Sequence, residues 1–148
     1  MIDYKLEGSP QLKEFVLSMT KYLKNPKITF KKCSLIMLKD IDKHFKNEEG
    51  PDRKWPDLKP LTILRRRKEG KGYKILQDTG TLKNLPSPII SKTGAEVGTN
   101  IVYARAHQEG YEPRNLPQRT FIWLSDEAER NIMDIFTLDL RHAGDNRQ

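Results

Sequence analysis

The sequence predicts an α+β protein that forms a single domain over residues 1–148, with N-terminal helices, a small mostly antiparallel sheet and a C-terminal helix. The length of 148 residues suffices for one modest hydrophobic core and is too short for two ordinary domains. Apolar residues recur at helical spacing in the first third of the chain and at its C-terminal end. Short strand-like runs, bounded by Gly, Pro or Asn, occupy the region between them.

The first predicted helix begins at Ser9-Pro10, because serine is a good N-cap and proline fits the first helical position. Apolar residues then follow at helical spacing, namely Leu12, Phe15, Val16, Met19 and Leu23. Asn25-Pro26 is expected to end this helix.

A second helix is predicted from about Thr29 to Phe45. Its apolar stripe contains Phe30, Cys33, Met37, Ile41 and Phe45. At about 100° per residue, four lysines cluster on the opposite stripe: Lys32, Lys39, Lys43 and Lys46. This helix should pack on one side and present ammonium groups on the other, as an ordinary surface helix also does.

Residues 47–60 contain a glycine, three prolines and many charges, and are predicted to form an ordered loop. Trp55 is expected to anchor the loop as a core plug rather than to serve as a ligand platform. A short helix should follow from Leu61 to Lys68. It carries four consecutive cations, Arg65, Arg66, Arg67 and Lys68, which cannot share one helical face. At least one of them should therefore meet a partner or a local acid.

Short strands are predicted at residues 74–77, 88–91, 96–99 and 119–124. Between the last two, Asn100 can cap a helix that runs to about Gln108 and is closed by Gly110. Tyr103 and His107 lie four residues apart in that helix, which predicts a packed pair rather than a catalytic or metal-binding role.

The last predicted helix is capped by Ser125 and has acidic residues in its first turn, as the helix dipole favours. Its apolar face consists of Ala128, Ile132, Ile135, Phe136 and Leu140. Arg141, His142 and Gly144 should end it. The chain ends, residues 1–8 and 144–148, are expected to be flexible.

The net charge of +7 is unevenly distributed. Residues 21–75 carry 17 Lys and Arg against 7 Asp and Glu, whereas the rest of the chain is slightly acidic. Such a basic region attracts nucleic acid, an acidic protein surface or anionic lipid, or is simply a solvated face. The candidate surface for a partner or for DNA consists of Lys32, Lys39, Lys43, Lys46, Arg65, Arg66, Arg67 and Lys68. No apolar run approaches the length of a signal peptide or a membrane span, which predicts a protein made in the cytoplasm without membrane contact.

The residues of the chain favour no enzyme, no cofactor and no metal site. The sequence Asp78-Thr79-Gly80 follows an apolar run, as in retroviral-type aspartic proteases, where two such aspartates share one proton. The flanking residues match that class poorly, so Asp78 is predicted to accept turn amides and Gly80 to allow a positive φ. Walker-type glycine loops, dinucleotide fingerprints and nucleophile elbows are absent from the sequence, and Cys33 is the single cysteine.

A string of short motifs carries a family resemblance. In order they are Trp55-Pro56-Asp57-Leu58 with Thr62, Asp78-Thr79-Gly80, Val97-Gly98-Thr99-Asn100, the segment from Tyr103 through His107 to Gly110, and Leu116-Pro117-Gln118-Arg119-Thr120-Phe121. In this order and spacing the chain resembles the phage virion morphogenesis family, the Mu-like tail completion proteins.

The resemblance implies structural roles for the motif residues, namely Trp55, Thr62, Asp78, Thr79, Gly80, Gly98, Tyr103, His107, Gly110, Pro117, Arg119 and Phe121. It further implies a structural virion protein at the neck, which completes the tail and helps join it to the head. The implied partners are further copies of the chain in a ring, the neighbouring tail-tube and head-neck proteins, and DNA through non-specific contacts. A small basic nucleic-acid-binding module is the alternative, weakened by the lack of a recognised nucleic-acid-binding motif.

Overall fold

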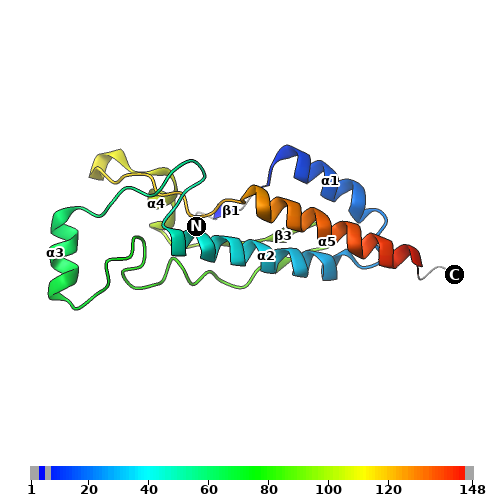
Figure 1. Ribbon diagram of the computed structural model, residues 1–148, viewed down its shortest axis with the longest axis horizontal. Helices are drawn as coiled ribbons and strands as arrows, with labels where there is room; N and C mark the ends of the chain where they lie inside the picture. The colour runs from blue at the N-terminus through cyan, green and yellow to red at the C-terminus, as the bar shows by residue number, and fades with distance from the viewer. Residues whose placement is uncertain (1–3, 6–7, 146–148) are drawn as a thin grey trace. The chain divides into compact units, whose positions relative to one another are not determined.

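A computed structural model describes residues 4–5 and 8–145 of the chain (Figure 1). The α-helices are α1 (Pro10–Thr20), α2 (Pro26–Asn47), α3 (Pro60–Lys68), α4 (Ala104–Glu109) and α5 (Asp126–Asp145), with a short 3₁₀ helix η1 (Glu112–Arg114). The strands are β1 (Tyr4–Lys5), β2 (Ile89–Ile90), β3 (Ala95–Glu96) and β4 (Gly98–Thr99). β2 runs antiparallel to β3, and β1 pairs with β4. The predicted α+β class, with N-terminal helices, a small antiparallel sheet and a C-terminal helix, is confirmed.

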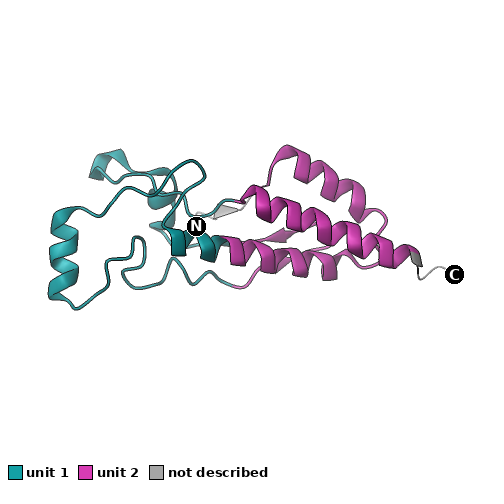
Figure 2. Ribbon diagram, in the orientation of Figure 1, with its two compact units in different colours: residues 1–4, 41–86, 98–123 teal, residues 5–40, 87–97, 124–148 magenta. Residues whose placement is uncertain are grey.

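The chain divides into two compact units (Figure 2). Unit 1 contains residues 1–4, 41–86 and 98–123, and unit 2 contains residues 5–40, 87–97 and 124–148. Helix α2 contributes its residues up to Asp40 to unit 2 and its last turns to unit 1. The single domain over residues 1–148 stays a prediction, since the compactness of a unit does not establish that it folds independently.

Unit 2 is built on the packing of α1 against α5 and on the buried stripe of α2 (Figure 1). Phe136 of α5 is fully buried and makes edge contacts with Phe15 and Phe30, at centroid distances of 6.4 Å and 5.6 Å. The predicted apolar stripe of α2 is buried at Phe30, Cys33 and Met37, and that of α5 at Ala128, Ile132 and Phe136. In α1 Leu12 is buried, whereas Phe15, Val16 and Met19 are partly exposed. Burial raises the pKa of the Cys33 thiol to about 12, so this cysteine stays protonated in the core.

Both predicted N-caps of unit 2 are confirmed. The Ser9 hydroxyl accepts from the Leu12 amide at 3.2 Å, and the Ser125 hydroxyl accepts from the Ala128 amide at 3.2 Å. Each serine is held in turn by a carboxylate from another helix. Glu129 accepts the Ser9 hydroxyl at 2.8 Å, and Asp40 accepts that of Ser125 at 2.7 Å. The caps therefore also tie the helices of unit 2 together.

The helix bounds differ from the predicted ones at several ends. α1 stops at Thr20, so Leu23 lies outside it, while α2 begins at Pro26 because proline fits a first helical turn. α4 begins at Ala104 with Tyr103 at its N-cap, and the predicted cap Asn100 lies outside it. Of the ends predicted to be flexible, residues 1–3, 6–7 and 146–148 lie outside the described residues, and residues 144–145 belong to α5.

The core of unit 1 centres on three aromatic rings. Phe45, at the end of α2, makes an edge contact with Trp55 and a tilted contact with Phe121, each at a centroid distance of 5.5 Å. The Trp55 side chain is buried, and its indole Nε1 donates to Thr120 O at 2.9 Å. This packing agrees with the predicted loop over 47–60 in which Trp55 is the core plug. Within that loop the backbones of Glu49 and Lys54 form an isolated antiparallel β-bridge.

Residues 74–77 and 119–124, both predicted as strands, belong to no strand. In the first segment Leu76 has a φ of 59°, and a left-handed residue cannot continue an extended strand. The Ile75 amide donates to the carboxylate of Glu48 at 2.6 Å instead of to a neighbouring strand. In the second segment, side chains from elsewhere in unit 1 replace the missing strand partner, as described below.

Candidate functional site

A pocket of about 370 Å³ opens in unit 1 between α3, the loop around residues 76–82, α4 and the segment from η1 to Arg119. Its lining includes apolar side chains, namely Leu58, Leu76, Leu82, Leu116 and Pro117. It also includes five cationic ones, namely Lys59, Arg65, Arg66, Arg114 and Arg119. Asp78 is the one carboxylate of the lining. The pocket is therefore an apolar cavity with a positively charged wall.

Many residues of the sequence motifs meet at this pocket although they are far apart in the chain. Those that line it are Leu58, Thr62, Asp78, Thr79, Tyr103, His107, Leu116, Pro117 and Arg119. Trp55 and Phe121 instead form the aromatic core of unit 1. Gly80 and Gly110 have φ angles of 76° and 82°, which a residue with a side chain adopts only with strain. Gly98 lies in β4. The motifs thus specify the pocket and the core beside it.

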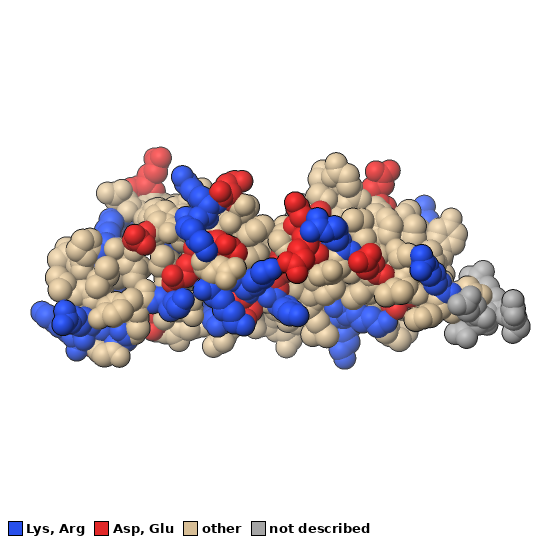
Figure 3. Space-filling view, in the orientation of Figure 1, with Lys and Arg blue, Asp and Glu red and all other residues tan. Residues whose placement is uncertain are grey.

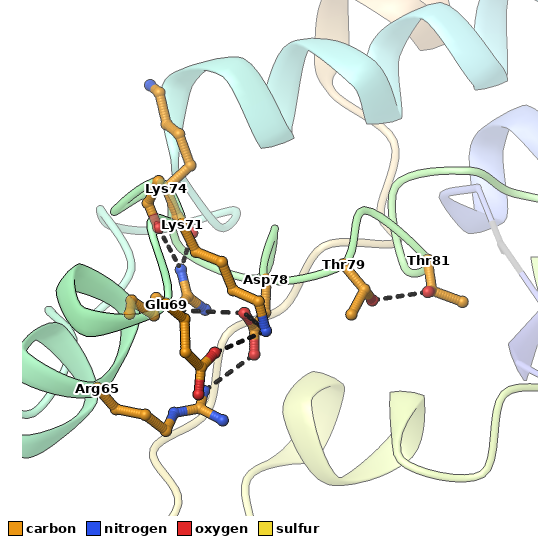
Figure 4. Close-up of polar contacts among 9 residues, drawn as sticks. Arg65, Glu69, Lys71, Lys74, Asp78, Thr79 and Thr81 are labelled. Carbon is orange, nitrogen blue, oxygen red and sulfur yellow. Dashed lines mark hydrogen bonds and ion pairs between the residues drawn. The ribbon is translucent and has the colours of Figure 1, made fainter.

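Asp78 stands at the centre of an ion cluster (Figure 4). Its carboxylate lies 2.9 Å from Arg65 Nη2 and 3.3 Å from Lys71 Nζ, and Lys71 also contacts Glu69 at 2.8 Å. Partial burial raises the pKa of the Asp78 carboxyl, but Lys71, Arg65 and the charge of Arg66 outweigh it and hold the pKa below its ordinary value. The expectation that Asp78 accepts turn amides is corrected, because the contacts found are cationic side chains.

Arg66 differs from the other cations of α3 because its side chain is buried. Its Nη1 donates to Lys74 O at 2.7 Å and to Gly72 O at 3.2 Å, and its Nε lies 3.8 Å from Asp78. The guanidinium therefore holds the turn after α3 by donating to its backbone carbonyls, which have no strand partner among the described residues. The prediction that Arg66 belongs to an exposed, partner-facing surface is corrected by this burial.

Arg119 is the second buried arginine of unit 1. Its Nε donates to Pro56 O and its Nη2 to Asp57 O, both at 2.9 Å, and its own amide donates to His107 O at 2.7 Å. One residue thus joins the Trp55 loop, α4 and the pocket wall. This geometry uses the planar fork of a guanidinium, which lysine lacks.

Gln108, which the sequence analysis did not single out, replaces a strand partner for residues 121–122. Its buried Oε1 accepts from the amides of Phe121 and Ile122 at 2.9 Å and 3.0 Å, and its Nε2 donates to Ile122 O at 2.7 Å. The Trp55 indole donates to Thr120 O, and His44 Nδ1 lies 3.3 Å from Phe121 O. The extended segment therefore satisfies its backbone groups through side chains, which explains why it joins no sheet. The position of Gln108 beside His107 in the motif was the available signal.

The predicted packing of Tyr103 with His107 is confirmed by an edge contact at a centroid distance of 6.2 Å. Burial, with the charge of Arg119, lowers the pKa of His107, which keeps the imidazole neutral at pH 7. Its Nδ1 is buried and makes no hydrogen bond within residues 8–145. Within the described ranges, no group of three or more His, Cys, Asp or Glu side chains could hold a metal ion.

The eight predicted basic-surface residues have different environments. Lys32 pairs with Asp139 at 2.6 Å, Lys46 with Asp42 at 2.7 Å and Arg65 with Asp78, while Arg66 is buried. Lys43 is exposed. Lys39, Arg67 and Lys68 are also exposed, and they have no ion-pair partner among the residues that the structure describes. Figure 3 shows acidic side chains interspersed with the basic ones on the face drawn. Internal pairing thus offsets part of the positive charge.

The surroundings of Asp78 differ from those of an aspartic protease. Such a protease needs a second carboxylate close enough to share a proton, which raises one of the two pKa values. Asp78 is surrounded by cations that lower its pKa, and the segment before it is not a strand. The geometry therefore favours a structural role for Asp78.

Replacing Asp78 by asparagine should lower the free energy of unfolding by about 1 kcal/mol at pH 7, because Arg65 and Lys71 lose an ionised partner. The folded pKa is below the ordinary aspartate value, so this stabilisation is present above about pH 3.9 and is lost as the pH falls through the folded pKa. Denaturant unfolding of the wild-type protein and the variant at several pH values should show their free energies of unfolding becoming equal at low pH. Asp52→Asn, at an exposed loop position, is the control. A difference that stays constant down to pH 2 would contradict the ionic role.

None of the helices within the described ranges is both long and apolar enough to cross a membrane. No curated protein and no solved structure matches the chain. The sequence pattern of the phage virion morphogenesis family, by contrast, matches residues 9–141, which include every motif at the pocket and the helices described above up to the last turn of α5. This chain belongs to the phage virion morphogenesis family.

Proposed function

We propose that this protein is a structural component of the virion that completes the tail and helps join it to the head at the neck, acting there as a homo-oligomeric ring. Membership of a structural phage family over residues 9–141 is the observation that carries the proposal, and it gives the chain a role in phage morphogenesis. The neck position and the ring are the finer parts of the proposal. The protein is proposed to act without catalysis or a cofactor.

The chemistry of unit 1 agrees with a structural role. Its two buried arginines donate to backbone carbonyls, and its central carboxylate is held among cations. These groups use their hydrogen bonds and charges to shape loops. A site for proton transfer would instead need a titratable group with a pKa adjusted for the reaction and access to a substrate.

Exposed apolar side chains on α3 support assembly with partners. Leu61 is 80 % exposed and Leu64 is 53 % exposed, and both lie on a helix of nine residues that ends in four cations. Exposed aliphatic groups that lie together on one helix are typical of surfaces that a partner covers, whereas a single exposed one is common on any protein. We assign this surface of α3 to contacts between copies of the chain or with a neighbouring neck protein.

Deletion of the gene in its phage tests the function. Negative-stain imaging should then show separate heads and tails, and the wild-type gene supplied in trans should restore joined particles. Leu61→Glu combined with Leu64→Glu should fold, because both side chains are exposed, but should fail to restore joining. Leu35→Glu, at a similarly exposed position of α2, is the matched control. A normal frequency of joined particles after deletion would overturn the proposal.

Contact with DNA is the second candidate function, favoured by the unpaired cations Lys39, Arg67 and Lys68. Phosphate contacts of this kind weaken as salt concentration rises, because binding releases counterions. Gel-shift measurements with duplex DNA over a range of salt concentrations separate the two candidates. The test variant combines Lys39→Glu, Arg67→Glu and Lys68→Glu. Salt-sensitive DNA binding that this variant loses, together with normal head-tail joining by the same variant, would favour the nucleic-acid-binding module.

A further inference from the structure

We propose that the pocket of unit 1 binds an acidic segment of a neighbouring virion protein, whose carboxylates pair with Lys59 and Arg114. The proposal rests on the proposed function only for the identity of the partner as a virion protein. The chemistry of recognition comes from the pocket itself.

The charge of the lining is the first argument. Five cationic side chains line the pocket, whereas Asp78 is its one carboxylate. Arg65 is paired with Asp78, and Arg66 Nε also lies 3.8 Å from that carboxylate. Arg119 donates to two backbone carbonyls, which leave its charge uncompensated, and one carboxylate cannot balance both Arg65 and Arg66. The buried guanidinium groups therefore contribute a positive potential that solvent screens less than it screens surface charges.

Two of the five cations are available to a ligand. Lys59 precedes α3 and Arg114 ends η1, and both side chains are exposed at the edge of the pocket. Neither has an ion-pair or hydrogen-bond partner for its side chain within the described part of the chain. Cations that line a cavity from two different segments are well suited to pair with the carboxylates of a ligand.

The apolar part of the lining favours a peptide over DNA. Leu76, Leu82 and Leu116 belong to the lining, and a cavity of about 370 Å³ has room for a few side chains. DNA backbones present phosphates on a convex surface and are usually met by exposed cations, without an apolar cavity. An acidic segment that also carries an aliphatic side chain satisfies both parts of the lining.

A peptide titration tests the proposal. The probe is an N-acetylated, fluorescein-labelled octapeptide of alternating glutamate and leucine, and its control has glutamine in place of glutamate. Fluorescence anisotropy should detect binding of the acidic peptide only, and ¹⁵N-resolved NMR should place the shifted amides around residues 58–66, 76–82 and 114–119. Arg114→Glu should weaken binding by about tenfold or more, because it reverses a charge at the ligand.

Arg67→Glu is the matched control, since it makes the same charge change on an exposed residue of α3 outside the pocket. It should alter the Kd by less than about twofold. Thermal unfolding checks that both variants fold. Equal weakening by the two variants, or NMR shifts outside the pocket, would overturn the proposal. Preference for a duplex DNA of equal charge would assign the pocket to nucleic acid instead. Self-association of the protein, measured by light scattering, that Arg114→Glu abolishes and Arg67→Glu does not would assign the pocket to a second copy.

The failures of the two proposals are distinguishable. If the peptide does not bind but deletion separates heads from tails, the pocket assignment is wrong and the neck function stands. If the peptide binds as expected but deletion leaves joining normal, the pocket chemistry stands and the neck function is wrong.

Discussion

Replacing Gln108 by leucine should lower the free energy of unfolding by about 3–5 kcal/mol. Leucine has a similar size but removes the acceptor of two buried amides, Phe121 N and Ile122 N, and the donor to Ile122 O. Each of these backbone groups would then be buried without a partner, because residues 121–122 pair with no strand of the described chain that could replace the Gln108 side-chain amide. Urea denaturation followed by tryptophan fluorescence measures the loss, and Trp55 reports directly on this core.

Gln118→Leu provides the control for this prediction, since it makes the same chemical change in the same unit. The Gln118 side chain is exposed and donates to Gln108 O and to the Thr120 hydroxyl. Thr120 also donates to Gln108 O, so that carbonyl keeps a partner. The cost should stay below about 1 kcal/mol. A loss at Gln108 no larger than that at Gln118 would show that water or a rearranged strand satisfies the amides of residues 121–122.

Replacing Arg119 by methionine should lower the free energy of unfolding by about 2–4 kcal/mol. Methionine fills most of the space, so the cost comes from Pro56 O and Asp57 O, which lose the donors that hold them. Arg119→Lys should recover at most about half of the loss, since an ammonium cannot reproduce the two parallel bonds of the guanidinium. Calorimetric unfolding of the three proteins provides the comparison.

Arg53→Met is the control for Arg119, because Arg53 is exposed on the same loop region and its side chain has no partner among the described residues. Its stability should change by less than about 0.5 kcal/mol. If Arg119→Lys were as stable as the wild-type protein, the positive charge and not the forked geometry of the guanidinium would explain how this loop connection is held.

The sequence by itself determined the elements whose signals are local. Ser9 and Ser125 cap helices because a hydroxyl next to a helix start meets an orphan amide, whatever lies further away. The apolar stripes of α2 and α5 predicted their buried faces, because a period near 3.6 residues places those side chains on one side. The order of the motifs likewise identified the family, and the sequence pattern over residues 9–141 confirms it.

The tertiary structure alone decided the roles that depend on distant partners. Arg66 and Arg65 are adjacent and identical in type, yet Arg66 is buried under two carbonyls while Arg65 is exposed beside Asp78. Residues 119–124 have the composition of a strand but receive their hydrogen bonds from Gln108, Trp55 and His44. Propensity reports how a segment fits an extended backbone, whereas the partner of that backbone is set by contacts far along the chain. The pocket arises in the same way, because its cations come from segments that only folding brings together.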